Sequence, residues 1–230
     1  MEGTWTEHFL SVAFPWGFGL VTFVWVLKGN RKSRNPLEWS RVDRCLLLIV
    51  LFCFVGGASN LMTGIAASFY FERLVWINWA WAQTYYQINR IIGIPWIPLL
   101  LLGLWLRRRS PENRVFAHIV IQYNAVHVAL ICYAFGPVTH PAPFLLGMAL
   151  GTLNFLLFEK KIALPWLVTF TTLTVGFSIA TWAGLMPYAP IFTSSAFTNG
   201  TVEPYYFIGT MVFTMVIFLL MILLSAYIFA

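Results

Sequence analysis

The chain has 230 residues, of which 60% are hydrophobic and only 10% are charged, whereas about a quarter of the residues in a typical soluble domain are charged. This composition excludes a water-soluble globular protein and predicts a protein embedded in lipid. The net charge of +6 does not indicate a nucleic-acid partner, because the basic residues fall in short clusters between apolar stretches rather than along one continuous face.

The apolar stretches predict an all-α, polytopic membrane bundle in a single transmembrane domain, residues 1–230. A helix needs about 20 mostly apolar residues to cross the hydrocarbon core, because its backbone polar groups must be satisfied within the segment. The fifth apolar stretch is short, and by length alone it could be re-entrant. In chain order the expected spans are Phe9–Leu27, Cys45–Phe71, Trp79–Leu106, Val115–Phe135, Pro143–Phe158, Ile162–Met186 and Pro204–Ala230.

The basic residues predict the orientation of the bundle. Of the 14 Lys and Arg residues, all except Arg73 and Arg90 lie in the first, third and fifth polar connections. Cytoplasmic loops carry an excess of Lys and Arg, so the N-terminus is expected outside the cytosol and the C-terminus inside it. If Pro143–Phe158 did not cross the membrane, Lys160 and Lys161 would lie outside, so about seven spans fit best.

The last polar connection, near Thr193–Glu203, is exoplasmic in this topology. It contains the sequon Asn199-Gly200-Thr201, which a eukaryotic cell could glycosylate, although such triplets are common by chance. No cleavable signal peptide is evident, because Glu2 and Glu7 stand where a basic region would be expected. In a eukaryote, we expect the protein in the membrane of the endoplasmic reticulum.

The third span has the clearest polar face. Gln83, Gln87 and Arg90 follow i, i+4 and i+7 spacing, so they share one side of a helix. An arginine this far along an apolar helix should point into the bundle or a wet cavity, where an anion or carbonyl oxygens can accept its hydrogen bonds. Alternatively, Arg90 reaches the exoplasmic interface or pairs with Glu72 or Glu203. Two polar residues flank this face, Tyr86 and Asn89.

The fourth span contains a second group of polar residues. His127 is the only candidate proton carrier at mid-depth, because no acidic residue lies at the centre of any expected span. His118 and His127 would be about 13 Å apart along a helix, so they cannot ligate one haem together. Interhelical hydrogen bonding is the alternative to ligand binding for this group. Its other members are Gln122, Tyr123 and Asn124.

Small residues mark two places of close approach. In the second span, Asn60 and Thr63 lie among glycines, which allows either tight packing or an opening for a ligand. In the fifth span, Gly147 and Gly151 form a GxxxG element, which permits close contact inside the bundle or in a homodimer.

No cofactor or metal is expected. The three cysteines, Cys45, Cys53 and Cys132, form no CxxC pair, so neither a zinc site nor a disulfide framework follows. The last span has no lysine for a retinal Schiff base, and the chain contains no HExxH, GxSxG or phosphate-loop motif.

The order of several landmarks resembles the EXPERA superfamily, which includes emopamil-binding protein and the sigma-2 receptor. The resemblance covers roughly residues 24–135 and extends to the entry of the last span. The residues on which it rests are Asn35-Pro36-Leu37-Glu38-Trp39, Phe69-Tyr70-Phe71-Glu72, Trp81, Asn89-Arg90-Ile91, Leu106-Arg107-Arg108-Arg109, Gln122 and Pro204-Tyr205-Tyr206-Phe207.

This resemblance implies a cavity for sterols or cationic amphiphiles, in which isomerase members of the family use histidine and glutamate to move a double bond. The chain departs from that pattern. Asn60 and Gly64 stand where the family has its histidine and glutamate in the second span, and the acid expected in the third span is missing. Two further spans, the fifth and sixth, have no counterpart. The family's proton shuttle therefore cannot operate here.

The sequence thus predicts an integral membrane protein that binds a hydrophobic, sterol- or terpenoid-like ligand in an intramembrane cavity, with membrane lipids as its other partners. Any reaction would be an isomerisation or cyclisation, with His127 as the catalytic residue. The expected ligand contacts are Asn60, Thr63, Gln83, Gln87, Arg90, Gln122 and Tyr123.

The alternative is a non-enzymatic heptahelical receptor, sensor or small-solute transporter. In that case, Arg90 would bind an anion near the exoplasmic entrance, and helix breaks at Pro95 and Pro98 would serve gating. A third alternative makes the chain a subunit buried in a larger assembly.

Overall fold

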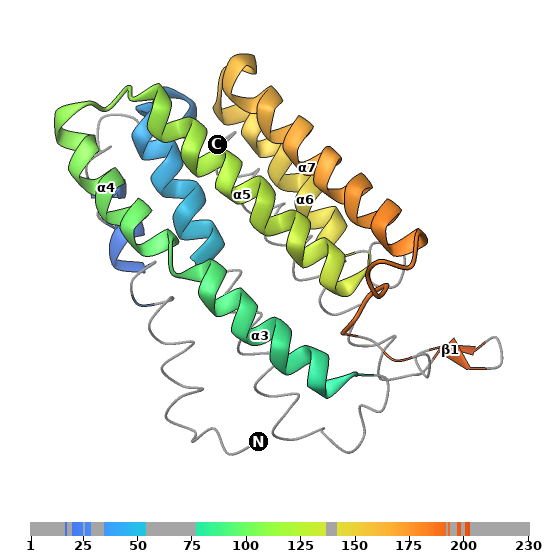
Figure 1. The fold of residues 1–230 in the computed structure, drawn as a ribbon. Coiled ribbons are helices and arrows are strands. Elements are labelled where there is room, and N and C mark those ends of the chain that lie inside the picture. The colour runs from blue at the N-terminus through green and yellow to red at the C-terminus, as the bar shows by residue number, and fades with distance from the viewer. Residues whose placement is uncertain are drawn as a thin grey trace. The chain divides into compact units, whose positions relative to one another are not determined.

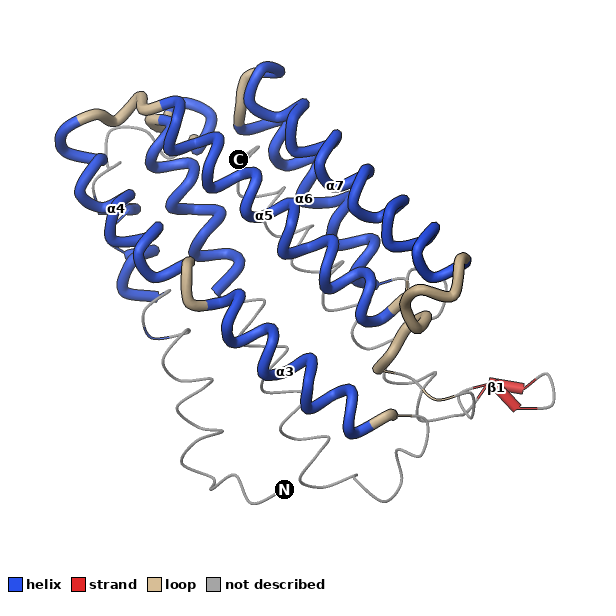
Figure 2. The backbone as a smooth tube through the Cα atoms, in the orientation of Figure 1, coloured by secondary structure: helices blue, strands red, loops and turns tan. Residues whose placement is uncertain are grey.

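The structure is a computed structural model that describes residue 17 and residues 20–24, 26–28, 35–53, 77–136, 142–191, 193, 197–198 and 201–202. Within these ranges the chain is almost entirely helical (Figure 1). Besides short loops and turns, Figure 2 shows a short antiparallel ladder between β1 and β2. The elements are η1 (Pro36–Glu38), α3 (Trp79–Gly93), α4 (Trp96–Arg109), α5 (Arg114–Phe135), α6 (Ala142–Leu157), α7 (Lys160–Trp182), β1 (Phe197–Thr198) and β2 (Thr201–Val202).

Three helical stretches are long and apolar enough to cross a membrane, as a membrane protein requires. They match the third, fourth and sixth expected spans, and α5 agrees with the fourth to within one residue. α6 has 16 residues, fewer than a span usually needs. The three stretches are Trp79–Arg109, Arg114–Phe135 and Lys160–Trp182.

The last expected span and most of the first and second lie outside the described residues, although residues 17, 20–24 and 26–27 of the first are helical. A total of about seven spans, the orientation of the termini and several passes through one membrane therefore remain predictions. The same holds for glycosylation, because the loop between β1 and β2 is Asn199-Gly200, which also lies outside the described residues.

The third expected span is interrupted. α3 ends at Gly93 and α4 begins at Trp96, because Pro95 has no N–H to donate and disfavours helical geometry in the residue before it. Pro98, the other expected break, lies in the first turn of α4, where a missing N–H removes no intrahelical bond. Only the first of the two prolines therefore coincides with a break.

Contacts between Cα atoms divide the chain into two units. The first comprises Met1–Leu74 and Gly93–Phe116, and the second comprises Val75–Ile92 and Ala117–Ala230. The division within the third span falls next to the helix break. That residues 1–230 form a single transmembrane domain remains a prediction.

At the polar end of the first unit, Arg107 connects α4 to two other segments of the chain. Its Nε atom lies 2.7 Å from Oδ1 of Asp43, and its Nη2 atom donates to the carbonyl of Val26 at 3.0 Å. Asp43 is held in turn by Ser40, which caps the helix of residues 41–53 by accepting from the Asp43 N–H and donating to its Oδ2 atom. One guanidinium therefore links three segments of the first unit.

α4 packs closely on the helix of residues 41–53. A Cβ atom on Gly103 would lie 2.8 Å from Cδ2 of Leu46 and 2.9 Å from the ring of Phe116, so no larger residue fits without a shift. Farther along the same contact, the rings of Phe52 and Trp96 are 5.2 Å apart. Close packing of this kind is how helices associate in lipid, where the hydrophobic effect gives no preference for their contact.

In the second unit, α6 packs on α7 (Figure 1), and its two glycines lie at this contact. A Cβ atom on Gly151 would lie 2.6 Å from the ring of Trp166, and one on Gly147 would lie 2.7 Å from the ring of Phe170. These two rings are stacked with centroids 5.0 Å apart. Side chains of the same chain therefore fill the space beside both glycines, which disfavours the predicted homodimer through them.

α3 is held against the end of α5 by the segment that follows α7. The N–H of Asn78 donates to the carbonyl of Ile191 at 2.8 Å, and the N–H of Ile191 donates to the carbonyl of Ala134. Ala82, Ala134 and Ile191 form a small buried cluster there. This anchor sets the register in which the polar residues of α3 and α5 meet.

Candidate functional site

α5 has a buried apolar face with polar residues on both of its edges. The buried apolar residues recur every three or four positions, as expected for a helix inside a bundle. Polar side chains at the edges of this face can reach α3 and α7. The buried apolar residues are Ala117, Val120, Ile121, Ala125, Val128, Ala129 and Cys132.

His127 meets Asn89 at the contact between α5 and α3. Its Nε2 atom lies 2.9 Å from Oδ1 of Asn89, and His127 is only 5% exposed. Since an amide oxygen can only accept a hydrogen bond, Nε2 is the protonated nitrogen and donates. The predicted catalytic histidine is therefore buried at mid-helix and oriented by an amide.

Tyr123 lies one turn before His127 and contacts the end of α3. Its hydroxyl donates to the carbonyl of Ile92. A continuous helix would satisfy this carbonyl with the N–H four residues later, but α3 ends at Gly93, and the last carbonyls of a helix have no partner within it. In lipid such a carbonyl needs another donor, and Tyr123 supplies it.

These residues form a compact polar arrangement, which we call the α3 clamp: Asn89, Ile92, Tyr123 and His127. The rings of Tyr123 and His127 are 6.4 Å apart and meet edge to face. Two side chains of α5 thus hold the last turn of α3 at two points. The clamp contains no charged side chain, so it suits a neutral polar group better than an ion.

The structure leaves two of the predicted residues of α3, Gln83 and Gln87, outside the clamp. Gln83 and Gln87 are exposed, whereas Asn89, expected only to flank their face, is the residue that contacts His127. Asn60, Thr63 and the side chain of Arg90 are not among the described parts of the structure. Their predicted roles in ligand binding remain predictions.

On its other edge, α5 is joined to α7 by two amides. Oε1 of Gln122 accepts a hydrogen bond from the hydroxyl of Thr169 at 2.5 Å, and Oδ1 of Asn124 accepts one from the indole N–H of Trp166 at 3.0 Å. The amide nitrogens of Gln122 and Asn124 are buried and have no hydrogen-bond partner among the described residues. Within the described part of the chain, each amide therefore retains an unused donor.

Asn154 is a polar residue that sequence reasoning missed. It lies on α6, is completely buried, and neither its amide oxygen nor its amide nitrogen has a partner among the described residues. The available signal was an amide three positions after Gly151, on the face that the GxxxG element marks for packing. Buried polar atoms without partners are rare, so this position is unusual.

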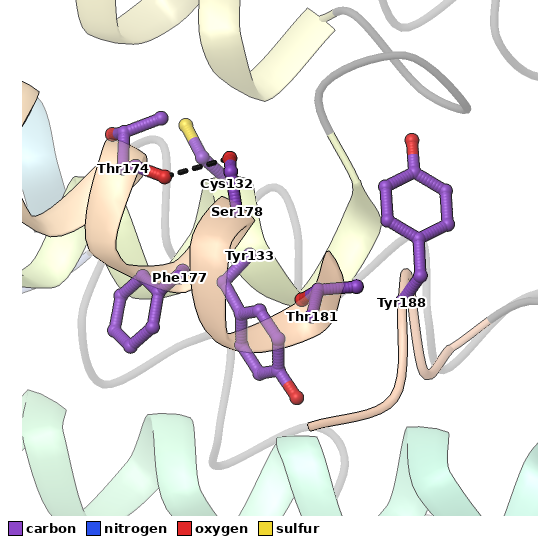
Figure 3. Close-up of a pocket in the computed structure, with 7 residues that line it drawn as sticks. All are labelled: Cys132, Tyr133, Thr174, Phe177, Ser178, Thr181 and Tyr188. Atoms are coloured by element: carbon purple, nitrogen blue, oxygen red, sulfur yellow. Dashed lines mark hydrogen bonds between the residues drawn. The ribbon is translucent and has the colours of Figure 1, made fainter. Parts of the chain in front are cut away.

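A small cavity lies near the end of α7 in the second unit (Figure 3). Its volume is about 20 Å³, which is room for a single water molecule and far too little for a sterol or terpenoid. The hydroxyl of Ser178 donates to the carbonyl of Thr174 on its wall, at 2.8 Å. The lining residues are Cys132, Tyr133, Thr174, Phe177, Ser178, Thr181 and Tyr188.

Among the described residues, no three His, Cys, Asp or Glu side chains lie close enough together to hold a metal ion. Comparisons of the chain with protein-family models, with curated proteins and with solved structures find no match. The site therefore has to be interpreted from its own chemistry, and the relationship to the EXPERA superfamily remains a prediction.

Proposed function

We propose that the chain is a multi-pass membrane protein of seven spans, N-terminus exoplasmic, that binds a hydrophobic ligand of the sterol or terpenoid type between its helices. The observation that supports this proposal best is the α3 clamp. It brings a buried histidine, a tyrosine and an asparagine together in the middle of apolar helices, where polar groups are uncommon and usually functional.

The chemistry of the site favours a neutral ligand. An ion in lipid needs a countercharge or full coordination, and the clamp offers neither. One hydroxyl or carbonyl oxygen, as sterols and many terpenoids have, needs only one or two hydrogen bonds. The amide nitrogens of Gln122 and Asn124, from which no described residue accepts a hydrogen bond, are donors of that kind.

A reaction at this site would use His127 to move a proton, because it is the only histidine at the clamp and no carboxylate belongs to it. Isomerisation of a double bond or cyclisation of a terpenoid would fit a single proton carrier. The imidazole donates through Nε2 to Asn89, so its Nδ1 atom is the basic position in that tautomer. Asn60, Thr63, Gln83, Gln87 and Arg90 remain proposed ligand contacts.

The break between α3 and α4 favours a second function, that of a small-solute transporter or sensor. Discontinuous helices often line the binding sites of transporters, because their free backbone groups face a cavity. In this alternative, Arg90 would bind an anionic solute. Replacement of Arg90 by glutamine should then abolish anion binding, whereas it should only weaken binding of a neutral lipid.

Photo-crosslinking of the purified full chain tests the ligand proposal. We expect photoactivatable sterol or terpenoid probes to label the protein in nanodiscs, to be displaced by the unlabelled parent compound, and to label His127→Leu several-fold less. His118→Leu is the matched control, because it removes a half-buried histidine of the same helix outside the clamp. Absence of displaceable labelling by any probe, together with absence of a co-purifying sterol or terpenoid, would contradict the proposal.

A further inference from the structure

Two acidic residues at the polar end of the first unit, Asp43 and Glu112, already pair with arginines. Arg41 pairs with Glu112 at 2.9 Å, and Arg107 pairs with Asp43 at 2.7 Å. Neither of these two carboxylates is therefore the countercharge of Arg109 or Arg114. Arg109 and Arg114 are both exposed, and neither has an ion pair among the described residues.

Arg109 continues an exposed, largely apolar stripe of α4. Leu101, Trp105 and Arg109 are spaced four residues apart and share one helical face, and the first two are 53% and 51% exposed. The guanidinium of Arg109 lies over the ring of Trp105, 5.0 Å from its centroid. A stacked guanidinium still has N–H groups at its edge that can bind a phosphate.

A short turn brings the second arginine to the same end of the helix. The N–H of Asn113 donates to the carbonyl of Ser110 at 3.1 Å, and Oδ1 of Asn113 accepts from the N–H of Phe116 at 2.8 Å. These bonds fix the turn of residues 110–113, and Arg109 and Arg114 stand on either side of it. The surface thus combines apolar side chains on the helix with two cations at its end.

We propose that Trp105, Arg109 and Arg114 bind the headgroup of an anionic phospholipid, with the exposed leucine side chains of α4 against its acyl chains. Guanidinium groups bind phosphate oxygens through paired, charge-assisted hydrogen bonds, and basic residues next to a membrane helix attract anionic lipids. The apolar stripe that leads to the arginines favours a lipid over free phosphate.

Fluorescence quenching by brominated lipids tests this surface directly. The full chain is reconstituted in phosphatidylcholine vesicles that contain either dibrominated phosphatidylglycerol or dibrominated phosphatidylcholine. The signal of Trp105 is obtained as the difference between each protein and its Trp105→Phe variant. We expect stronger quenching by the anionic lipid, and a loss of about fivefold in its relative association constant for each arginine replaced by glutamine.

Three controls make each result decisive. Lys161→Gln removes an exposed charge elsewhere and should leave the preference intact. An unchanged preference in Arg109→Gln/Arg114→Gln, or an equal loss in Lys161→Gln, would overturn the proposal. Inorganic phosphate should not displace the lipid more than chloride does at equal ionic strength, since displacement would assign the surface to free phosphate. If the double variant does not fold, the two single variants give the same comparison.

Discussion

The imidazole of His127 and the amide of Asn89 form a hydrogen bond of 2.9 Å between α5 and α3, and the imidazole is almost completely buried there. If either residue is replaced by an apolar one, the other is left buried without a hydrogen bond, which costs free energy. The bond therefore orients the histidine and sets the register of the two helices at the same time.

Asn89→Leu should lower the free energy of unfolding by about 1–3 kcal/mol, because it leaves the buried imidazole N–H without its acceptor. The double variant Asn89→Leu/His127→Leu should lose less than the sum of the single variants, with a coupling of about 1 kcal/mol. Unfolding in mixed micelles measures all of these values. His118→Leu should be additive with Asn89→Leu, and additivity of the His127 pair would contradict the observed bond.

Tyr123→Phe removes the hydroxyl that satisfies the carbonyl of Ile92 next to the helix break. We expect a loss of about 1 kcal/mol in unfolding free energy, together with faster hydrogen exchange in the last turn of α3. Tyr133→Phe is the matched control, because the ring of Tyr133 stacks on Phe177 with centroids 5.0 Å apart and that contact survives the change. Equal effects of the two substitutions would show that the break does not depend on Tyr123.

The described helices were largely predictable from the sequence, whereas their mutual contacts were not. Apolar length gave α5 to within one residue, because a lipid environment leaves little other choice. Sequence spacing did not predict which side of α3 contacts α5. Gln83 and Gln87 share a polar side with Arg90, yet Asn89 is the residue in contact with His127. That outcome depends on the anchor at Ile191, a long-range contact that no local spacing encodes.

The same distinction applies to small and polar residues within the bundle. GxxxG spacing predicted close approach at Gly147 and Gly151, but not that the rings of Trp166 and Phe170 would fill the space. Both Pro95 and Pro98 predict a helix break from sequence alone. Only Pro95, immediately before α4, coincides with a break, whereas Pro98 lies in the first turn of α4, which tolerates proline.

Gly151→Ala should destabilise the protein by about 1–3 kcal/mol, because the added methyl group would lie 2.6 Å from the ring of Trp166. Gly176→Ala on α7 is the matched control. A Cβ atom there meets no atom within 4 Å, so the change should stabilise the helix by about 0.5–1 kcal/mol. If both variants shift the free energy of unfolding in the same direction, the close contact between Gly151 and the ring of Trp166 is contradicted.

Asp43→Asn should cost about 3–5 kcal/mol of stability, because it leaves the buried charge of Arg107 without its countercharge. Oδ1 of Asp43 makes a close ion pair with Arg107 but no well-aligned hydrogen bond, so the loss should fall at the lower end of this range. Glu112→Gln provides the comparison, because that carboxylate is 60% exposed and its pair should contribute at most about 1 kcal/mol. Added salt should reduce only the exposed contribution, and equal salt dependence would contradict the burial of the first pair.

Asn154 and Asn124 are both buried amides, but they should respond in opposite ways to replacement by leucine, a residue of similar size. Asn124 accepts a hydrogen bond from the indole of Trp166, so Asn124→Leu leaves that N–H without its acceptor and should cost about 1–3 kcal/mol. Asn154 has no partner among the described residues, so Asn154→Leu removes two unsatisfied atoms and should be neutral or stabilising. The two free energies of unfolding decide the matter, because a large loss in Asn154→Leu would mean that this amide is hydrogen-bonded, most simply to a buried water molecule.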